Sequence, residues 1–271
     1  MYNNSDLSVV VVSYDGYSDL WEDFFTLKNQ NWANCPYPTY LANNVKNFQF
    51  KDVNVINCGL AAQWSDRARF ALQNINTKYV CLMVEDFFIS DVVSNDKFKS
   101  IISFMEKENI CFYKLQTMSK IKTPYFNGIK GLRVIPSNLP YGVSLTTAIW
   151  DREYLLSLIG PDSYNPWKFE INMVKQAEMA KEPFTCVGVF DETDPLHICH
   201  MVVQGKYIPS SLAEMKKRGY EINTSGRKTL SMVDVMKRNI KALCVPLAQK
   251  MPLLRTLGKY FGIESIQRRE S

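Results

Sequence analysis

The chain has 271 residues, of which 46% are hydrophobic and 22% are charged, and its formal net charge is +5. This composition is typical of a globular protein with a sizeable core, and it argues against a disordered chain. The sequence contains no run of about 18 consecutive apolar residues, so we expect no segment that spans a bilayer.

The seven cysteines are odd in number, form no C-x-x-C pair, and in several cases lie in apolar runs such as 79–84. This pattern predicts reduced cysteines in a cytoplasmic protein, and it favours neither a disulfide framework nor a zinc site. The first residues carry no basic region, so we expect the chain to open on a strand and not on a signal peptide.

The first third of the chain alternates between β-branched runs and segments with helical spacing. We predict strands over 7–13, 36–42, 53–56 and 79–84, with helices over 18–30 and 63–75. Such alternation predicts an α/β fold whose mostly parallel mixed sheet is flanked by helices. In open sheets of this kind, ligands bind outside the carboxyl ends of the strands.

The second part of the chain is less regular. We predict helices over 96–108, 152–159 and 166–180, and strands over 110–115, 143–150 and 184–190. Residues 117–142 contain three prolines and predict a long loop, which we interpret as a lid or a binding loop.

The end of the chain is basic. Residues 1–213 are predicted to form the main domain, and residues 214–271 a basic amphipathic helical extension. Lys216 to Ser271 contain 13 Lys and Arg residues against 4 Asp and Glu residues. This charge favours an anionic membrane surface as partner. The alternative is a helical pair that packs on the main domain and turns its basic face to solvent. Nucleic acid is not expected, since interleaved aromatic residues and a recognised motif are missing.

Two adjacent carboxylates, Glu85 and Asp86, directly follow the predicted strand over 79–84. Carboxylates in this place are costly unless they bind a cation, accept hydrogen bonds or meet solvent. Mg²⁺ binds one or two carboxylates together with substrate phosphates, so a divalent cation (Mg²⁺ or Mn²⁺) suits this pair. The alternative is an acidic cap on the following turn or helix.

Residues 57–72 followed by 77–86 resemble the nucleotide-sugar glycosyltransferases of the GT-A fold, a Rossmann-like architecture. In that family a helix rich in small and basic residues precedes a strand that ends in an acidic motif. The resemblance covers about residues 7–205 and is nearest to bacterial enzymes that build surface polysaccharides such as capsule or O-antigen. It implies sugar transfer from a nucleoside diphosphate to a glycan acceptor, which we expect to be lipid-linked, at the inner face of the cytoplasmic membrane.

The resemblance also implies roles for single residues near the donor. Tyr14 and Asp15 would hold the base and ribose, and Asp66 and Arg67 would face the donor, with Arg67 a natural partner for phosphate. Asp86 would take the place of the metal-binding acid, with Glu85 beside it.

The acidic motif departs from the D-x-D pattern, since neither Val84 nor Phe88 is acidic. Metal dependence is therefore open, and basic residues are the alternative for neutralising the diphosphate. The incomplete motif also keeps a second function in view, a non-catalytic glycan- or nucleotide-binding module that retains the transferase fold.

A second acidic position lies near the start of the helix predicted over 166–180. Glu170 corresponds in place and order to the general base of inverting GT-A enzymes, and the indole of Trp167 would stack on an acceptor sugar. The alternative is an acidic residue that complements the helix dipole.

A third group follows the last predicted strand of the sheet. His200 and Lys206 flank a glycine turn and would close on the donor pyrophosphate, where they would stabilise the leaving group electrostatically. His197 is predicted to be structural. The sequence shows no nucleophilic triad and no G-x-S-x-G or Walker motif, so we expect an inverting reaction.

Overall fold

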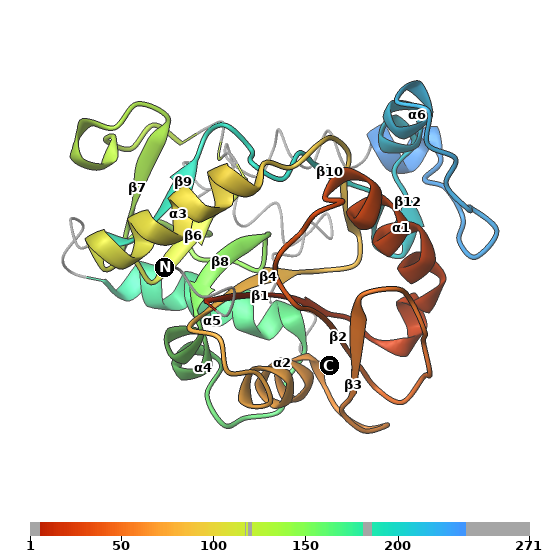
Figure 1. The fold of residues 1–271 in the computed structure, drawn as a ribbon, viewed down its shortest axis with the longest axis horizontal. Helices are drawn as coiled ribbons and strands as arrows, with labels where there is room; N and C mark the ends of the chain where they lie inside the picture. The colour runs from red at the N-terminus through yellow and green to blue at the C-terminus, as the bar shows by residue number, and fades with distance from the viewer. Residues whose placement is uncertain (1–5, 117, 119–120, 181–185, 237–271) are drawn as a thin grey trace, which may run out of the picture. The chain divides into compact units, whose positions relative to one another are not determined.

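The computed structural model of the chain describes residues 6–116, 118, 121–180 and 186–236 (Figure 1). It divides into two units, Met1–His200 and Met201–Ser271. This division lies ahead of the boundary at 213/214 that we predicted from the sequence. Most of the predicted amphipathic extension, residues 237–271, lies outside the described residues.

Within the described residues, the first unit is built on an eight-stranded sheet with the order β3-β2-β1-β4-β8-β6-β9-β7. Strands β3, β2, β1 and β4 run parallel, as do β6 and β9, whereas β8 and β7 run antiparallel to their neighbours. The strands are β1 (Leu7–Val12), β2 (Thr39–Asn43), β3 (Val53–Asn57), β4 (Tyr79–Met83), β6 (Phe112–Lys114), β7 (Leu132–Pro136), β8 (Ala148–Asp151) and β9 (Cys186–Asp191).

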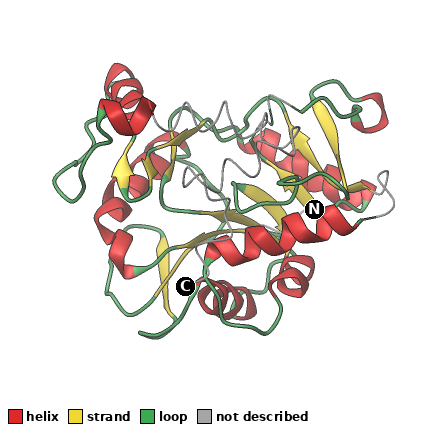
Figure 2. Ribbon diagram, turned by 180° about the vertical axis from the view of Figure 1, so that it is seen from behind, coloured by secondary structure: helices red, strands yellow, loops and turns green. Residues whose placement is uncertain are grey.

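Helices cover both faces of this sheet (Figures 1 and 2). On one face lie α1 (Trp21–Asn31), which follows the 3₁₀ helix η1 (Asp15–Leu20), and α3 (Asn95–Glu108). On the other lie α2 (Trp64–Gln73), α4 (Arg152–Ile159) and α5 (Pro166–Met179). The predicted α/β fold class, a mixed and mostly parallel sheet flanked by helices, is confirmed.

The buried faces explain why these segments form these elements. All six residues of β1 and all five of β4 are buried, as expected for central strands covered on both sides. The core between the sheet and α2, α4 and α5 includes Val10, Leu82, Ala68, Leu155 and Phe169.

The helices begin at residues suited to cap them. Ser94, Asp151 and Asn165 each accept a hydrogen bond from a backbone N–H in the first turn of α3, α4 and α5, respectively. Pro166 follows Asn165 at the first helical position, where its missing N–H has no helical partner to lose.

Four short elements, described below, were missed by the sequence prediction. The segment 117–142, predicted as a loop, contains the 3₁₀ helix η2 (Phe126–Gly128) and the edge strand β7, which ends at Pro136. Strand β5 (Phe87–Ile89) pairs antiparallel with β10 (Ile198–His200) in a separate two-stranded sheet. Strands of three residues leave no alternation to detect, so these pairings come from tertiary contacts.

The second unit contains a short hairpin of β11 (Val202–Val203) and β12 (Lys206–Tyr207), followed by α6 (Pro209–Lys217). Gln204 and Gly205 have φ values of 52° and 73°, which a tight type I′ hairpin turn requires. Across the part of the chain that the structure describes, no helix combines the length and the apolar character needed to cross a membrane.

Candidate active site

The strand order places a topological switch point between β1 and β4. From β1 the chain moves outward to β2 and then β3, and it returns to the other side of β1 with β4. Open α/β sheets bind ligands outside the carboxyl ends of the strands at such a point. Tyr14 and Asp15 directly follow β1 here, and Glu85 and Asp86 follow β4.

The carboxylate of Asp15 joins the ends of β1 and β2. It accepts hydrogen bonds from the backbone N–H groups of Asn44 at 3.2 Å and of Val45 and Lys46, both at 3.1 Å. Asp15 therefore fixes the loop beside the switch point. Its predicted contact with the donor ribose stays a prediction.

The ring of Tyr14 offers a partly exposed aromatic surface at the same edge. The residue is 43% exposed, and the guanidinium carbon of Arg67 lies 5.9 Å from the centre of its ring. A Cβ at Gly16 would come within 2.4 Å of this ring, so a larger residue there would require the Tyr14 ring to shift. The predicted contact between Tyr14 and a nucleobase is compatible with this exposure.

Arg67 reaches the switch point from the first turn of α2. The residue is 7% exposed, and its Nη1 donates to the carbonyl of Ala62. Its Nε is buried and, among the described residues, meets no hydrogen-bond acceptor. Burial lowers the pKa of the guanidinium, and the nearby Glu85 carboxyl opposes this most strongly. A buried N–H without an acceptor is costly, so an anionic group placed here would be bound favourably.

Glu85 is the more buried of the two adjacent acids, with 6% of its surface exposed. Burial and then the neighbouring charge of Asp86 raise its pKa to about 8, although the Ser13 hydroxyl and Arg67 act in the opposite direction. At neutral pH this side chain is therefore mostly protonated, and it lines the switch point as a neutral group.

Replacing Glu85 with glutamine should stabilise the protein at alkaline pH. Because the folded state holds a proton that the unfolded state releases near pH 4.3, the free energy of unfolding falls between about pH 4.3 and pH 8. Glu85→Gln removes this decline, and at pH 8 it should exceed the wild type by on the order of a few kcal/mol. Urea unfolding at pH 5 and pH 8 measures the difference.

Glu22→Gln is the matched control, since Glu22 lies exposed in the first turn of α1. It should leave the free energy of unfolding nearly unchanged at both pH values. An equal stability difference between wild type and Glu85→Gln at pH 5 and pH 8 would contradict the raised pKa.

Asp86 pairs with His200 through the small β5–β10 sheet. This pairing sets His200 opposite Phe87, and the two rings stack with their centres 4.6 Å apart. His200 Nε2 then lies 3.4 Å from Asp86 Oδ2, and the side chains are 36% and 21% exposed, respectively. The structure thus brings together two residues that the sequence separates by more than a hundred positions.

The donor set at this point suits a divalent cation only in part. Among the described residues, no group of three or more His, Cys, Asp and Glu side chains is arranged to hold a metal ion. Asp86 and His200 offer one oxygen and one nitrogen, so a cation here would take its other ligands from substrate phosphates and water.

Glu170 and Trp167 lie one turn apart at the start of α5. Trp167 is 47% exposed, whereas Glu170 is partly buried and its carboxylate accepts a hydrogen bond from the backbone N–H of Leu145 at 3.2 Å. Burial raises the pKa of Glu170, while the Leu145 N–H and the Lys114 ammonium lower it in part. A carboxylate with a raised pKa is suited to general-base work near neutral pH.

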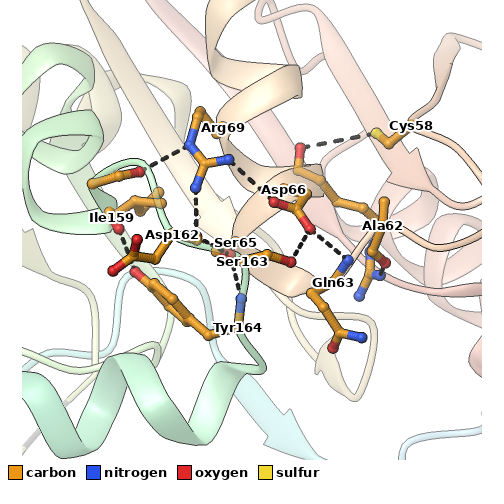
Figure 3. A network of polar contacts seen from close by, with 12 residues as sticks. Cys58, Ala62, Gln63, Ser65, Asp66, Arg69, Ile159, Asp162, Ser163 and Tyr164 are labelled. Carbon is orange, nitrogen blue, oxygen red and sulfur yellow. Dashed lines mark hydrogen bonds and ion pairs between the residues drawn. The ribbon is translucent and has the colours of Figure 1, made fainter.

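Asp66 belongs to a network that joins α2 to the loop before α5 (Figure 3). Its carboxylate accepts from the Gln63 backbone N–H at 2.9 Å, from Ser163 Oγ at 2.5 Å and from Arg69 at 3.1 Å. Burial would raise its pKa, but these hydrogen bonds outweigh that effect and leave the pKa below its ordinary value. Asp66 therefore caps the helix, and its predicted donor contact stays a prediction.

Ser65 and Arg69 complete the same network. Ser65 Oγ accepts from the backbone N–H of Tyr164 at 2.8 Å and donates to the carbonyl of Asp162 at 2.9 Å. Arg69 donates to the carbonyls of Gly160 and Asp162 at 2.8 and 2.6 Å (Figure 3). The loop over 160–164 is thereby tied to α2, which fixes the start of the helix that carries Glu170.

Lys206 lies in the second unit, where its Nζ forms an ion pair of 3.0 Å with Asp234. Its predicted contact with the pyrophosphate stays a prediction.

The sequence prediction missed Lys114 and Ser13 as polar groups of this edge. Lys114 is the last residue of β6, and since β6 runs parallel to β4 it lies at the same edge of the sheet. A signal was present, because a lysine inside an apolar strand is costly without partners. Ser13 gave no such signal, since its hydroxyl is small and only the fold brings Trp21 Nε1 within 2.8 Å of it.

Comparison with known proteins gives a likeness at the level of fold. No protein-family model matches the chain, and no curated protein matches it. Among solved structures, the chain is similar to TarS 1–349 of S. aureus, with 12% identity, a TM-score of 0.44 and coverage of 69% of this chain and 60% of the TarS 1–349 chain. Another structure of TarS 1–349 is a complex with UDP-GlcNAc, with 14% identity, a TM-score of 0.39 and coverage of 69% and 58%.

A cytidylyltransferase of Leptospira borgpetersenii is similar to a comparable degree. The identity is 12%, the TM-score is 0.41, and the match covers 84% of this chain and 98% of that enzyme. All three TM-scores lie below 0.5, and the assignment of residues rests on the geometry of the site.

Proposed function

We propose that the chain transfers a sugar from a nucleoside-diphosphate donor to a glycan acceptor. The observation that carries this proposal is the set of polar groups at the switch point. The buried Arg67, whose Nε–H lacks an acceptor among the described residues, lies near Glu85. Asp86, the next residue after Glu85, pairs with His200. Such a point in an open α/β sheet binds nucleotides, and these groups suit a diphosphate.

The donor diphosphate would lie against Arg67, with Asp86 and His200 on its other side. Asp86 and His200 are the protein groups that would hold a Mg²⁺ or Mn²⁺ ion, which would neutralise charge on the leaving diphosphate. Tyr14 would cover the base, and Asp15, Asp66 and Lys206 remain proposed donor contacts.

Glu170 would act as the general base. It would take the proton of the acceptor hydroxyl while the acceptor oxygen forms a bond to the anomeric carbon of the sugar. The bond from that carbon to the phosphate oxygen would break, and the diphosphate would leave with the electron pair. A single displacement of this kind inverts the anomeric centre, and Trp167 would stack on the acceptor sugar.

The acceptor is proposed to be a lipid-linked glycan of a bacterial surface polysaccharide, met at the inner face of the cytoplasmic membrane. The basic character of residues 216–271 supports this, since it would attract the chain to anionic lipid. The full chain should sediment with anionic liposomes at low salt and be released at high salt. Equal sedimentation with neutral liposomes would contradict this proposal.

Titration calorimetry with a panel of nucleotide sugars and nucleoside diphosphates, with and without Mn²⁺, tests the function directly. We expect binding of at least one nucleotide sugar, followed by transfer or slow hydrolysis of that donor. Binding without any turnover would indicate a binding module, and no binding across the panel would overturn the proposal.

A further inference from the structure

A buried lysine lies at the carboxyl end of β6, on the face of the sheet that α5 covers. Lys114 is 4% exposed, and its Nζ donates to the carbonyls of Tyr141 at 3.3 Å and Gly142 at 3.4 Å and to Ser144 Oγ at 2.9 Å. All three acceptors belong to the loop that leads into β8. The ammonium group therefore holds this loop from within the protein.

The same loop holds the Glu170 carboxylate through the backbone N–H of Leu145. The backbone of the 141–145 loop is tightly constrained, since Tyr141 has a φ of 61°. A Cβ at Gly142 would lie 2.7 Å from Ile135 Cγ2 and 2.9 Å from the carbonyl of Leu139. A non-glycine residue in the left-handed region persists only where its surroundings enforce it, and Lys114 supplies part of that enforcement.

Lys114 and Glu170 also act on each other through their charges. Burial lowers the pKa of Lys114 to about 8, and the charge of Glu170 opposes that fall. Lys114 in turn lowers the pKa that burial raises in Glu170. Tyr141 also interacts with Glu170, and it interacts with Glu178 of α5 as well. From α2, the uncharged Trp64 packs on Phe169 beside Glu170.

We propose that Lys114 is a positioning residue for the general base: it anchors the 141–145 loop that holds Glu170 and keeps the Glu170 carboxylate ionised when the acceptor binds. This inference rests on the proposed function, in which Glu170 takes the proton of the acceptor. Lys114 itself touches no substrate in this scheme.

The pH dependence of kcat tests the inference. In Lys114→Met the ammonium no longer favours the carboxylate, so the acid limb of the kcat profile should move up by about one pH unit. At pH values below that limb, kcat should fall roughly tenfold, with the KM for the donor nearly unchanged. Lys114→Arg keeps the charge and should return the acid limb toward its wild-type position.

Lys97→Met is the matched control. Lys97 forms an ion pair of 2.9 Å with the buried carboxylate of Asp191 at this edge. Lys97→Met should lower the melting temperature without moving the acid limb of the kcat profile. If Lys114→Met lowers kcat equally at all pH values, Lys114 is structural and the inference is overturned.

A double-mutant cycle on the melting temperature separates this inference from the proposed function. Glu170→Gln should restore part of the melting temperature lost in Lys114→Met, because it removes a carboxylate that no longer has the Lys114 ammonium near it. Additive losses overturn the inference. If the two losses are coupled but the wild-type protein binds no nucleotide sugar, the proposed function is overturned, while the electrostatic interaction between Lys114 and Glu170 stands.

If Lys114→Met does not fold, the pH dependence of stability in Glu170→Gln tests the inference instead. Because the Lys114 pKa is lowered in the folded state, stability should rise between about pH 8 and pH 10.4. Loss of the Glu170 charge lowers that pKa further, so the rise should begin at lower pH in Glu170→Gln. An unchanged stability curve overturns the coupling.

Discussion

Glu170→Gln should lower kcat by roughly 10²- to 10⁴-fold, the usual contribution of a general base. The amide keeps an oxygen for the backbone N–H of Leu145, so the 141–145 loop should stay in place. Glutamine cannot take the acceptor proton, however, and the chemical step loses its base. A transfer assay at saturating donor, combined with calorimetry for donor affinity, separates the two effects.

The pH profile makes this prediction sharper. Because burial raises the pKa of Glu170, wild-type kcat should rise with pH as the carboxylate loses its proton. In Glu170→Gln that rise should vanish, while the Kd for the donor should stay within about twofold. A lost rise together with an unchanged Kd would assign the acid limb to Glu170.

Glu178→Gln is the control on the same helix. Glu178 is exposed and lies about two turns further along α5. The kcat of Glu178→Gln and the acid limb of its pH profile should match those of the wild type. If Glu170→Gln retains wild-type turnover, Glu170 is not the base, and the single-displacement reaction has lost its proton acceptor.

The regular part of the fold could be predicted from the sequence because local patterns suffice for it. The runs at 7–13 and 79–84 are mostly apolar, which is the pattern of central parallel strands, and the strands β1 and β4 that they form are buried. The helices α3, α4 and α5 have caps and breakers next to the helical spacing. The edge where the carboxyl ends of the parallel strands meet follows from this alternation, whereas the order of the strands and the antiparallel direction of β8 and β7 do not.

From residue patterns alone, the part of the candidate site that follows a strand end was the easiest to predict. Glu85 and Asp86 stood out for that reason. The sequence did not show that Glu85 is buried whereas Asp86 is partly exposed. Burial makes Glu85 a neutral group, and β5 pairs with β10 to bring His200 to Asp86. Both effects arise from contacts between distant segments, which a spacing argument does not contain.

The polar groups around Glu170 were hidden for a different reason. Lys114 occurs in an apolar strand, and its acceptors are two backbone carbonyls and a serine in a segment that reads as loop. Backbone carbonyls are present at every residue, so the sequence gives no sign of which ones a buried lysine will use.

Arg67→Met should raise the Kd for the donor by roughly 10- to 100-fold, the loss expected for a hydrogen bond to a charged group worth about 1.5–3 kcal/mol. Methionine replaces most of the buried stem of the side chain, so packing against the start of α2 should persist. The fold should tolerate the change at neutral pH because Glu85 is mostly protonated there and leaves no unpaired charge behind.

The affinity loss should depend on the charge of the ligand. If Arg67 binds phosphate, the loss should be largest for a nucleoside diphosphate and its sugar, and small for the nucleoside alone. It should also shrink as salt rises, although less than for an exposed pair, since Arg67 is 7% exposed. Calorimetry with these three ligands at two salt concentrations measures both trends.

Arg69→Met supplies the contrast within the same helix, since Arg69 donates to the carbonyls of Gly160 and Asp162 and to Asp66. Arg69→Met should lower the melting temperature, because it removes the hydrogen bonds that tie the 160–164 loop to α2, but it should leave the donor Kd within about twofold. Equal losses of affinity in both variants would mean that α2 acts only as a scaffold. A loss confined to Arg67→Met, and absent for the nucleoside, places the diphosphate at the switch point between β1 and β4.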